Sequence, residues 1–215
     1  MKNFDHHIET EILFGEGKIK GFGKKIAAVT DSVLLCYGGG SIKKNGVYDA
    51  AVAELKANGV RYEELSGIDP NPRIESVRAG IALVKKHRLG GVLAVGGGSV
   101  IDCAKAIAGG AATPHEDAWD LVVSSAFTAA LPVFSVLTLS ATGSEMDAFA
   151  VITNFETNEK LGCVVARPVC SVLDPSYTFT VPAHQTAAGS ADILSHIFES
   201  YFSKVRTAYV QDRFA

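Results

Sequence analysis

Short apolar runs alternate with segments of helical periodicity through the first half of the chain. Three times a run typical of a buried strand is followed by a segment with apolar residues every three to four positions. We expect strands at 32–37, 60–65 and 92–95, and helices at 45–58, 73–88 and 100–108. Glycines follow each helix, with Gly109-Gly110 closing the third. This alternation predicts an α/β fold with a parallel sheet and helices on both faces.

The pattern is less regular after residue 110. A long loop containing Trp119 is expected at 111–131, followed by a buried strand at 133–137. Strand-like pieces are expected at 149–153, 161–166 and 169–173, with a turn at 156–159. After Asp174-Pro175 the character changes, and from Pro182 to the last residue the pattern is helical. We therefore place a domain boundary near residue 181.

Composition narrows the class of protein. The 215 residues are 47% hydrophobic and 20% charged, which is enough for a packed core and excludes a disordered chain. A net charge of −3 without a long basic block argues against a nucleic-acid partner. The N-terminus has no apolar signal core and no apolar stretch is long enough to span a bilayer, so we expect a soluble, cytoplasmic protein.

The cysteines support the same compartment. They lie in apolar surroundings and form no C-x-x-C pair, so we expect buried free thiols in a reducing cytoplasm and no zinc knuckle. Their positions are Cys36, Cys103, Cys163 and Cys170.

The sharpest local feature is the segment 93–105, in which a strand runs into Gly96-Gly97-Gly98-Ser99 and then into a helix. Glycine lets a backbone approach a phosphate closely, and a helix N-terminus carries partial positive charge. The order of elements is that of a dinucleotide-binding fold, although the G-x-G-x-x-G fingerprint is absent. We expect Ser99 to cap the helix. A tight turn without any ligand explains the same residues equally well.

A second glycine cluster, Gly38–Ser41, follows the first predicted strand. Dinucleotide folds often place an acid here to bind the ribose 2′-hydroxyl. This segment has no acid and is followed by Lys43 and Lys44, which favours NADP over NAD; a loop with solvated lysines is the alternative. The small hydroxylated residues of segment 137–145 could line a cofactor groove or simply form turns.

The last predicted helix carries Asp192 and His196, four residues apart and therefore on one face, which Gln185, Gly189 and Glu199 share. A carboxylate and an imidazole suit a divalent metal such as Fe²⁺ or Zn²⁺. An ordinary Asp–His contact is the commoner explanation of such a pair. The spacing of the other histidines does not complete a metal site.

Taken together, these segments resemble the iron-dependent (group III) alcohol dehydrogenases, especially their NADPH-dependent butanol dehydrogenase branch. The matching stretches follow the family order and span nearly the whole chain. They are Tyr37-Gly-Gly-Gly-Ser-Ile-Lys-Lys-Asn-Gly46, Leu65-Ser-Gly-Ile-Asp-Pro-Asn-Pro72, Ala94-Val-Gly-Gly-Gly-Ser-Val-Ile-Asp-Cys-Ala-Lys105, Ala141-Thr-Gly-Ser-Glu145 and Thr186-Ala-Ala-Gly-Ser-Ala-Asp-Ile-Leu-Ser-His196.

The resemblance implies a dinucleotide-binding α/β domain over residues 1–181. Residues 182–215 would begin an all-helical metal and substrate domain that is incomplete, with the active site in the cleft between the two. Glycines 97–98 and Ser99 would contact the pyrophosphate, and residues 39–41 the adenosine ribose. The full set of implied cofactor-binding residues is Gly39, Gly40, Ser41, Gly97, Gly98, Ser99, Asp102, Thr138, Thr142 and Lys160. Thr138 and Thr142 would flank the cofactor, and Lys160 would reach its nicotinamide ribose.

The resemblance also implies a function. Asp192 and His196 would be the first two ligands of Fe²⁺ or Zn²⁺, and hydride would pass between NAD(P)H and a small alcohol or aldehyde such as butanol or butanal. A homodimer is expected. The family's helical domain is longer and supplies two further histidines, so we interpret this chain as a fragment rather than a short degenerate form. The alternatives are a non-catalytic nucleotide-binding fragment and an enzyme of the glycerol dehydrogenase or dehydroquinate synthase type.

Overall fold

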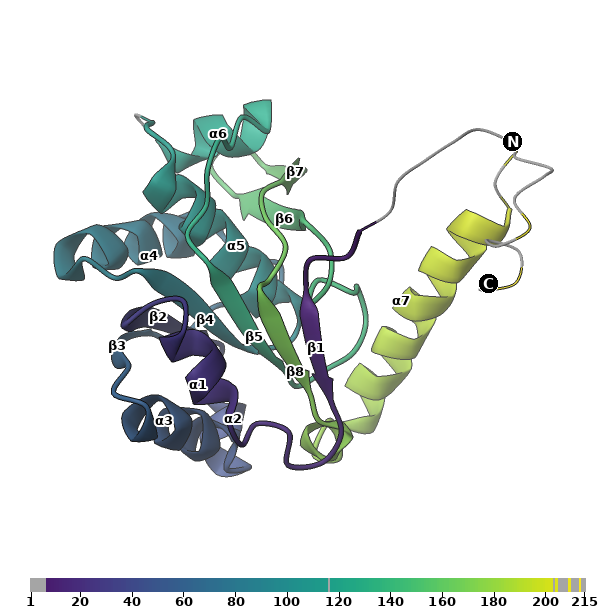
Figure 1. Cartoon of the computed structure of the whole chain (residues 1–215). Coiled ribbons are helices and arrows are strands. Elements are labelled where there is room, and N and C mark those ends of the chain that lie inside the picture. The colour runs from purple at the N-terminus through teal and green to yellow at the C-terminus, as the bar shows by residue number, and fades with distance from the viewer. Residues whose placement is uncertain (1–6, 116, 203, 205–208, 210–212, 214–215) are drawn as a thin grey trace.

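The computed structural model describes residues 7–115, 117–202, 204, 209 and 213. Within this part, six parallel strands form one sheet in the order β1-β8-β5-β4-β2-β3 (Figure 1). The parallel sheet expected from the sequence is confirmed. Its strands are β1 (Glu11–Phe14), β2 (Ser32–Tyr37), β3 (Arg61–Leu65), β4 (Gly91–Gly96), β5 (Val133–Leu137) and β8 (Cys170–Leu173).

Helices cover both faces of this sheet, as Figure 1 shows. One face carries α1 (Phe22–Ala27) and α3 (Val47–Ala57) beside the short α2 (Ser41–Lys44); the other carries α4 (Ile74–His87) and α5 (Gly98–Ala112). Every residue of β2, β4 and β5 is buried, which explains why these strands are continuous apolar runs. Alternate side chains of β2 enter the two cores, Leu35 on the α3 side and Leu34 on the α4 side.

The strand register brings three loops to one edge of the sheet. Tyr37 pairs with Val95, and Val95 pairs with Val136. The carboxyl ends of β2, β4 and β5 are therefore level, and the segments that follow them begin side by side.

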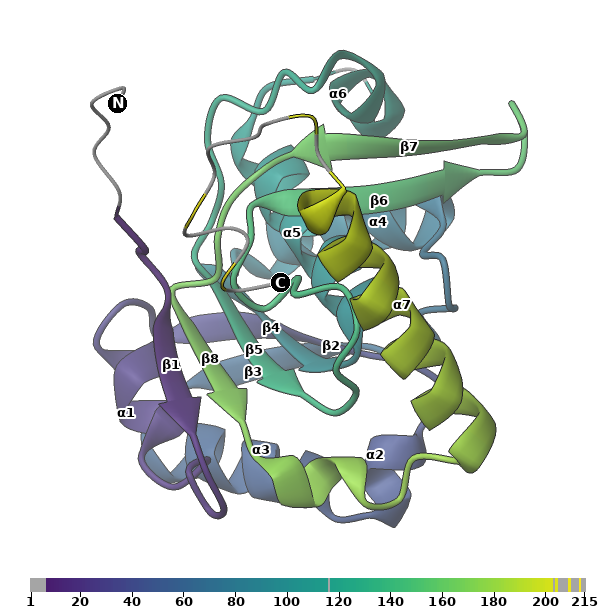
Figure 2. The same cartoon turned by 90° about the vertical axis from the view of Figure 1, so that its right-hand side faces the viewer.

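A separate antiparallel hairpin joins β6 (Phe149–Asn154) and β7 (Glu159–Val164). It confirms two of the expected strand pieces and the turn between them. Ala150, Ile152 and Cys163 of this hairpin are buried in the same core as α5. The hairpin thus lies over the α5 face of the main sheet, on the far side from α3 (Figure 2).

The chain leaves β8 through a 3₁₀ turn, η1 (Pro175–Thr178), and enters α7 (Ala183–Tyr201). Helix α7 stands beside the α/β body, and among its residues only Gly189 is buried (Figures 1 and 2). The helix expected from Pro182 onward is confirmed as far as Tyr201. Most of the residues after Phe202 lie outside the described part, so its predicted continuation to the last residue is not assessed. None of the helices in the described ranges is both long and apolar enough to cross a membrane.

Helix α5 corrects one expectation. The sequence pattern predicts a helix end at Gly109-Gly110, but α5 continues through both to Ala112. An added Cβ at Gly109 would lie 2.5 Å from Phe127, and one at Gly110 would lie 2.4 Å from Ile81. These glycines serve close packing against neighbouring elements and do not end the helix.

The segment between α5 and β5 corrects another. The loop expected at 111–131 contains α6 (Ala118–Ser124), which includes Trp119. The carboxylate of Asp117 caps this helix by accepting from the Trp119 amide at 2.7 Å, and it also binds the Arg78 guanidinium at 2.8 and 3.0 Å. Strand β1 and helix α1 are further elements that the pattern did not reveal.

All four cysteines are buried and free, as expected. Burial raises the pKa of the Cys103 thiol to about 12 and that of the Cys163 thiol to about 11. These thiols are consequently protonated and unreactive near neutral pH.

Candidate functional site

The loops that follow β2, β4 and β5 enclose a hollow of about 290 Å³. Strand β2 lies between β3 and β4, and the chain's direction of winding reverses there. Open α/β sheets bind ligands at such a point, beyond the carboxyl ends of the strands. The hollow brings together three segments singled out in the sequence. Its lining consists of Gly38–Ile42, Val95–Val100, Thr138–Leu139, Ile68, Pro70 and Gln185.

The first turn of α5 opens into this hollow. The amides of Val100 and Ile101 donate to the Gly97 carbonyl at 3.0 and 3.2 Å. The amides of Gly98 and Ser99 precede them, where helical N–H groups have no intrahelical acceptor. No acidic residue lies in this turn. The helix dipole and these amides therefore suit an anion such as a pyrophosphate.

Glycine is required here by crowding. A Cβ on Gly96 would lie 2.6 Å from Val100, and a Cβ on Gly98 would lie 2.6 Å from the Thr142 hydroxyl. Gly98 thus allows the threonine-bearing loop after β5 to approach the start of α5. Ser99 does not cap α5, contrary to expectation, because the cap position is Gly97 and Ser99 lies within the helix.

Asn71 links the start of α5 to the β6–β7 hairpin. Its amide donates to Ser99 Oγ at 3.3 Å, and its side-chain Oδ1 accepts from Lys160 Nζ at 2.7 Å. Its φ of 53° is left-handed, a conformation that asparagine tolerates better than most residues. Lys160 is thereby held near the hollow without lining it. The motifs that predict the site assign no role to Asn71, although an asparagine between two prolines signals a fixed turn.

Asp102 faces away from the hollow lining. Its carboxylate accepts from Ser144 Oγ at 2.6 Å and from the Val151 amide at 2.9 Å. Burial is the main reason that the pKa of Asp102 is raised, and the two hydrogen bonds oppose it. Both carboxylate oxygens have protein partners, so this residue supports the site from behind.

Lys105 completes this buried network. Its side chain is 0% exposed, and Nζ donates to Ser144 Oγ at 2.9 Å, Asp147 Oδ1 at 2.8 Å and the Phe149 carbonyl at 2.9 Å. Burial lowers the pKa of Lys105, while the contact with Asp147 opposes that shift. The network ties the loop after β5 to α5. This network is not predicted from the sequence, because a lysine on a helix does not by itself indicate burial.

Asp192 and His196 lie side by side on α7, with 3.8 Å between Oδ2 and Nε2. That separation is longer than a hydrogen bond, so the lone pairs of both groups are available. Their side chains are 43% and 54% exposed. A carboxylate and an accessible imidazole fit a divalent metal as two of its ligands. Among the described residues, no group of three or more His, Cys, Asp or Glu side chains that could hold a metal ion is found.

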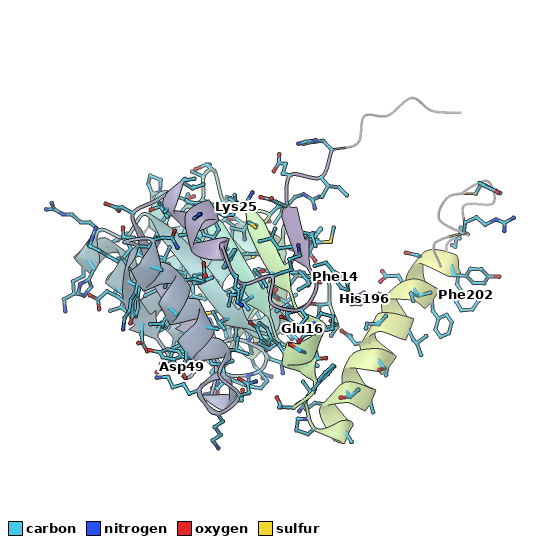
Figure 3. The ribbon with its side chains drawn as sticks, turned by 60° about the horizontal axis from the view of Figure 1, so that its bottom comes forward. Phe14, Glu16, Lys25, Asp49, His196 and Phe202 are labelled. Atoms are coloured by element: carbon cyan, nitrogen blue, oxygen red, sulfur yellow. The ribbon has the colours of Figure 1, made fainter. Side chains whose placement is uncertain are left out.

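The face of α7 that carries this pair also meets the hollow and the loop after β5. Gln185 lines the hollow, and a Cβ on Gly189 would lie 2.9 Å from the Ser140 carbonyl oxygen. Residues 185, 189, 192 and 196 share one face of the helix. In Figure 3 His196 lies on the side of α7 turned toward the α/β body, whereas Phe202 lies on the other side.

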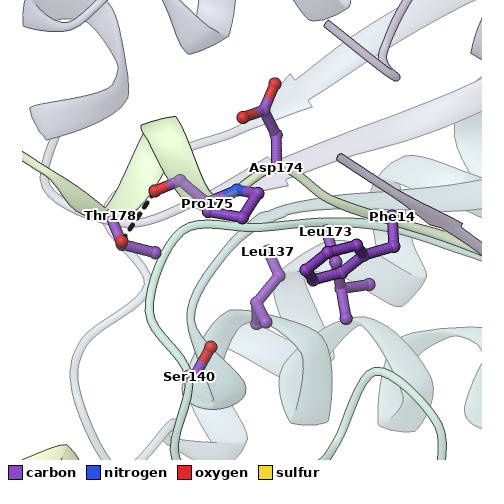
Figure 4. A pocket seen from close by; sticks show the side chains of 7 residues that line it. All are labelled: Phe14, Leu137, Ser140, Leu173, Asp174, Pro175 and Thr178. Atoms are coloured by element: carbon purple, nitrogen blue, oxygen red, sulfur yellow. Dashed lines mark hydrogen bonds between the residues drawn. The ribbon is translucent and has the colours of Figure 1, made fainter. Parts of the chain in front are cut away.

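A second hollow of about 150 Å³ lies at the carboxyl ends of β1, β5 and β8 (Figure 4). Phe14, Leu137 and Leu173 make it largely apolar. The Asp174 carboxylate at its edge is already satisfied, because it accepts from the Gly17 amide at 2.7 Å and the Ser176 amide at 2.9 Å. The Thr178 hydroxyl likewise donates to the Pro175 carbonyl at 2.7 Å. This hollow therefore lacks a free charged group, and the glycine-lined hollow is the stronger candidate.

Comparisons with known proteins agree with this geometry. Residues 9–175 match the sequence profile of the family described as iron-containing alcohol dehydrogenase. The whole chain is 56% identical to NADH-dependent butanol dehydrogenase A of Clostridium acetobutylicum, and it covers 56% of that protein. It is 43% identical to the NADPH-dependent aldehyde reductase YqhD of Escherichia coli and again covers 56% of it. The chain thus spans about half the length of these relatives.

Solved structures give the same result. NADH-dependent butanol dehydrogenase A of Thermotoga maritima matches with a TM-score of 0.94 at 46% identity, over 99% of this chain and 54% of that one. E. coli YqhD matches with a TM-score of 0.92 at 41% identity, over 99% of this chain and 55% of that one. The resemblance seen in the sequence motifs is confirmed, and the chain belongs to the iron-containing alcohol dehydrogenase family.

Proposed function

We propose that this chain is the cofactor-binding part of a metal-dependent alcohol dehydrogenase or aldehyde reductase acting on small substrates such as butanol and butanal. One observation carries the proposal. The face of α7 that bears Asp192 and His196 also carries Gln185, which lines the glycine-lined hollow, and Gly189, which packs against the loop after β5. A dinucleotide in the hollow and a metal on α7 would therefore be neighbours. We also propose that a domain boundary near residue 181 separates the α/β part from the helical part, because α7 begins just after it.

Each residue of the hollow has a distinct task in this proposal. The amides of Gly98 and Ser99 bind the pyrophosphate beyond Gly97, while residues 39–41 lie by the adenosine ribose. Thr138 and Thr142 flank the cofactor on the β5 side. Lys160, held by Asn71, reaches the nicotinamide ribose. Asp102 acts indirectly, by fixing the loop that carries Thr142.

Asp192 and His196 would hold an iron ion, the metal that the family's description names. A bound iron would supply a Lewis acid for the substrate oxygen, and a bound nicotinamide would supply the hydride chemistry. The described residues position these groups: the carboxylate provides negative charge and the imidazole a neutral nitrogen. The remaining ligands would come from outside the described residues. A homodimer is a proposal that rests on family likeness, and a cytoplasmic location is a proposal that rests on the buried free thiols.

The role of Asp192 and His196 as metal ligands is tested in the whole protein that the reading frame encodes. Asp192→Ala and His196→Ala should each lower the rate of butanal reduction by more than 100-fold, a rough figure for loss of a metal ligand, with bound iron falling in parallel. NADH affinity, measured by fluorescence titration, should stay within about twofold. Ser195→Ala, on the same helix and exposed, is the matched control. Wild-type turnover and iron content in either alanine variant would refute the assignment.

The cofactor role has its own test. Gly97→Val should weaken dinucleotide binding by about tenfold or more, because the side chain would occupy the path of the pyrophosphate. The fold should persist, since a Cβ at Gly97 would meet Leu139 only at 3.5 Å, an ordinary contact. Gly162→Val, in a position with no atom within 4 Å, is the control. Unchanged affinity in Gly97→Val would count against the phosphate-binding role. Assays with butanal and with dihydroxyacetone separate this reaction from a glycerol dehydrogenase activity.

A further inference from the structure

Lys43, just after the Gly38–Ser41 turn, contacts two aromatic rings and a carboxylate, and its side chain is 47% exposed. Its Nζ lies 4.9 Å from the Tyr37 ring centroid and 4.4 Å from the Tyr48 centroid. The same nitrogen is 3.6 Å from Glu64 Oε2. We call these three partners of Lys43 the lysine cage. Cation–π and ionic attraction act on this ammonium together.

The carboxylate of the lysine cage is itself fixed. The Tyr37 hydroxyl donates to Glu64 Oε2 at 2.6 Å, and the Tyr48 hydroxyl donates to Oε1. The two rings pack edge to face, with centroids 5.7 Å apart. Burial alone would raise the pKa of Glu64, but the tyrosine hydroxyls and Lys43 together lower it. Glu64 is thus an anion at neutral pH, held in place from two sides.

The position of the lysine cage in the fold gives it a role. Tyr37 ends β2, Glu64 lies on the adjacent strand β3, and Lys43 is two residues from Ser41, which lines the hollow. Dinucleotide folds distinguish the ribose 2′-hydroxyl from the 2′-phosphate near the end of such a strand. A 2′-phosphate there needs a free cation, and the cage engages Lys43, the first of the two lysines that favour NADP in the sequence.

We propose that Glu64 is a specificity-determining residue: by holding Lys43 in the lysine cage it keeps this cation from a ribose 2′-phosphate and favours NADH over NADPH. This inference rests on the proposed dinucleotide site and reverses the preference expected from the two lysines alone. Glu64 acts by competing with the phosphate for Lys43.

The experiment compares kcat/KM for NADPH and NADH in the enzyme, with butanal as substrate. Glu64→Gln should raise the NADPH-to-NADH ratio by up to about fivefold, the range set by exposed ion pairs. Adding Lys43→Met should cancel the gain, because the released cation is then absent. Glu63→Gln is the matched control: it alters the neighbouring residue on β3, whose carboxylate contacts His87 at 3.3 Å.

Tyr48→Phe provides a second variant in case Glu64→Gln disturbs the fold, which thermal unfolding would show. It removes one restraint on the carboxylate and should shift the ratio in the same direction by a smaller factor. An unchanged ratio in folded Glu64→Gln and Tyr48→Phe, or a gain that survives Lys43→Met, would overturn the inference. If the wild type binds neither NADH nor NADPH, the proposed function itself fails. Binding of both with an unchanged ratio overturns only the role of Glu64.

Discussion

The two Gly-Gly-Gly-Ser segments of this chain are alike in sequence and different in structure. After β4, the glycines are crowded, since a Cβ on Gly96 or Gly98 would meet a side chain at 2.6 Å, and they lead into the fifteen-residue α5. After β2, Gly39 and Gly40 have no atom within 4 Å of an added Cβ, Gly40 has a φ of 94°, and a four-residue helix follows. One segment needs glycine for close approach and the other for a left-handed turn.

The two turns also differ in the lysine that lies next to each of them. The β4 turn is backed by the buried cation of Lys105, which holds a neighbouring loop in place. The β2 turn is backed by Lys43 at the surface, which Glu64 engages. Similar glycine motifs therefore say little about which part of a ligand each segment meets; the elements packed behind them decide that.

The largest expected effect lies behind the β4 turn. Lys105→Met removes a buried cation and leaves the carboxylates of Asp102 and Asp147 without it, which should cost about 3 kcal/mol of unfolding free energy. Urea denaturation measures this loss. Lys44→Met, near the β2 turn, should change stability by less than about 0.5 kcal/mol. Equal small effects in the two variants would remove the contrast between the turns.

A middle-sized effect separates the glycines themselves. Gly96→Ala should destabilise the fold by about 1–3 kcal/mol, because the new Cβ would press on buried Val100. Gly39→Ala should be nearly neutral, since space is open around it. Thermal unfolding of both variants gives the comparison. A Gly39→Ala variant as unstable as Gly96→Ala would show that the β2 turn is crowded too.

The smallest effect concerns pH. Glu64 has a lowered pKa in the folded chain, so its ionisation adds stability that is present above its unfolded pKa of about 4.3 and is lost as pH falls. Asp102 has a raised pKa, so stability falls as pH rises from about 3.9 through its folded value. Urea titrations at several pH values give the unfolding free energies of wild type, Glu64→Gln and Asp102→Asn. The difference between wild type and each variant is then plotted against pH. The two plots should have slopes of opposite sign. Slopes of the same sign would contradict this assignment.

The central fold could be predicted because apolar runs and helical periods coincide there with the real elements. Strands β2 and β5 have the predicted bounds, and the helices at α3 and α4 differ only at their ends. The predictions of helix bounds failed where one residue type can serve more than one structural purpose. Gly109-Gly110 resembles a helix stop but permits close packing, and the polar start of α6 hides a helix that Asp117 caps.

The candidate site was predictable in its backbone and less so in its support. Glycine clusters and the spacing of Asp192 and His196 can be read from residue types alone. The partners of Lys43 and Lys105 come from distant segments, so only the folded chain reveals which lysine is buried and which is engaged. For the same reason the sequence suggested a free cation beside the β2 turn where the structure has an engaged one.

The buried cysteines described above make this chain convenient for labelling. Because its native thiols are shielded and protonated, a cysteine introduced at an exposed position such as Ser195 of α7 would react first with a maleimide dye. A single fluorophore could then report whether α7 moves against the sheet as a nucleotide enters, without removing any natural residue of the core.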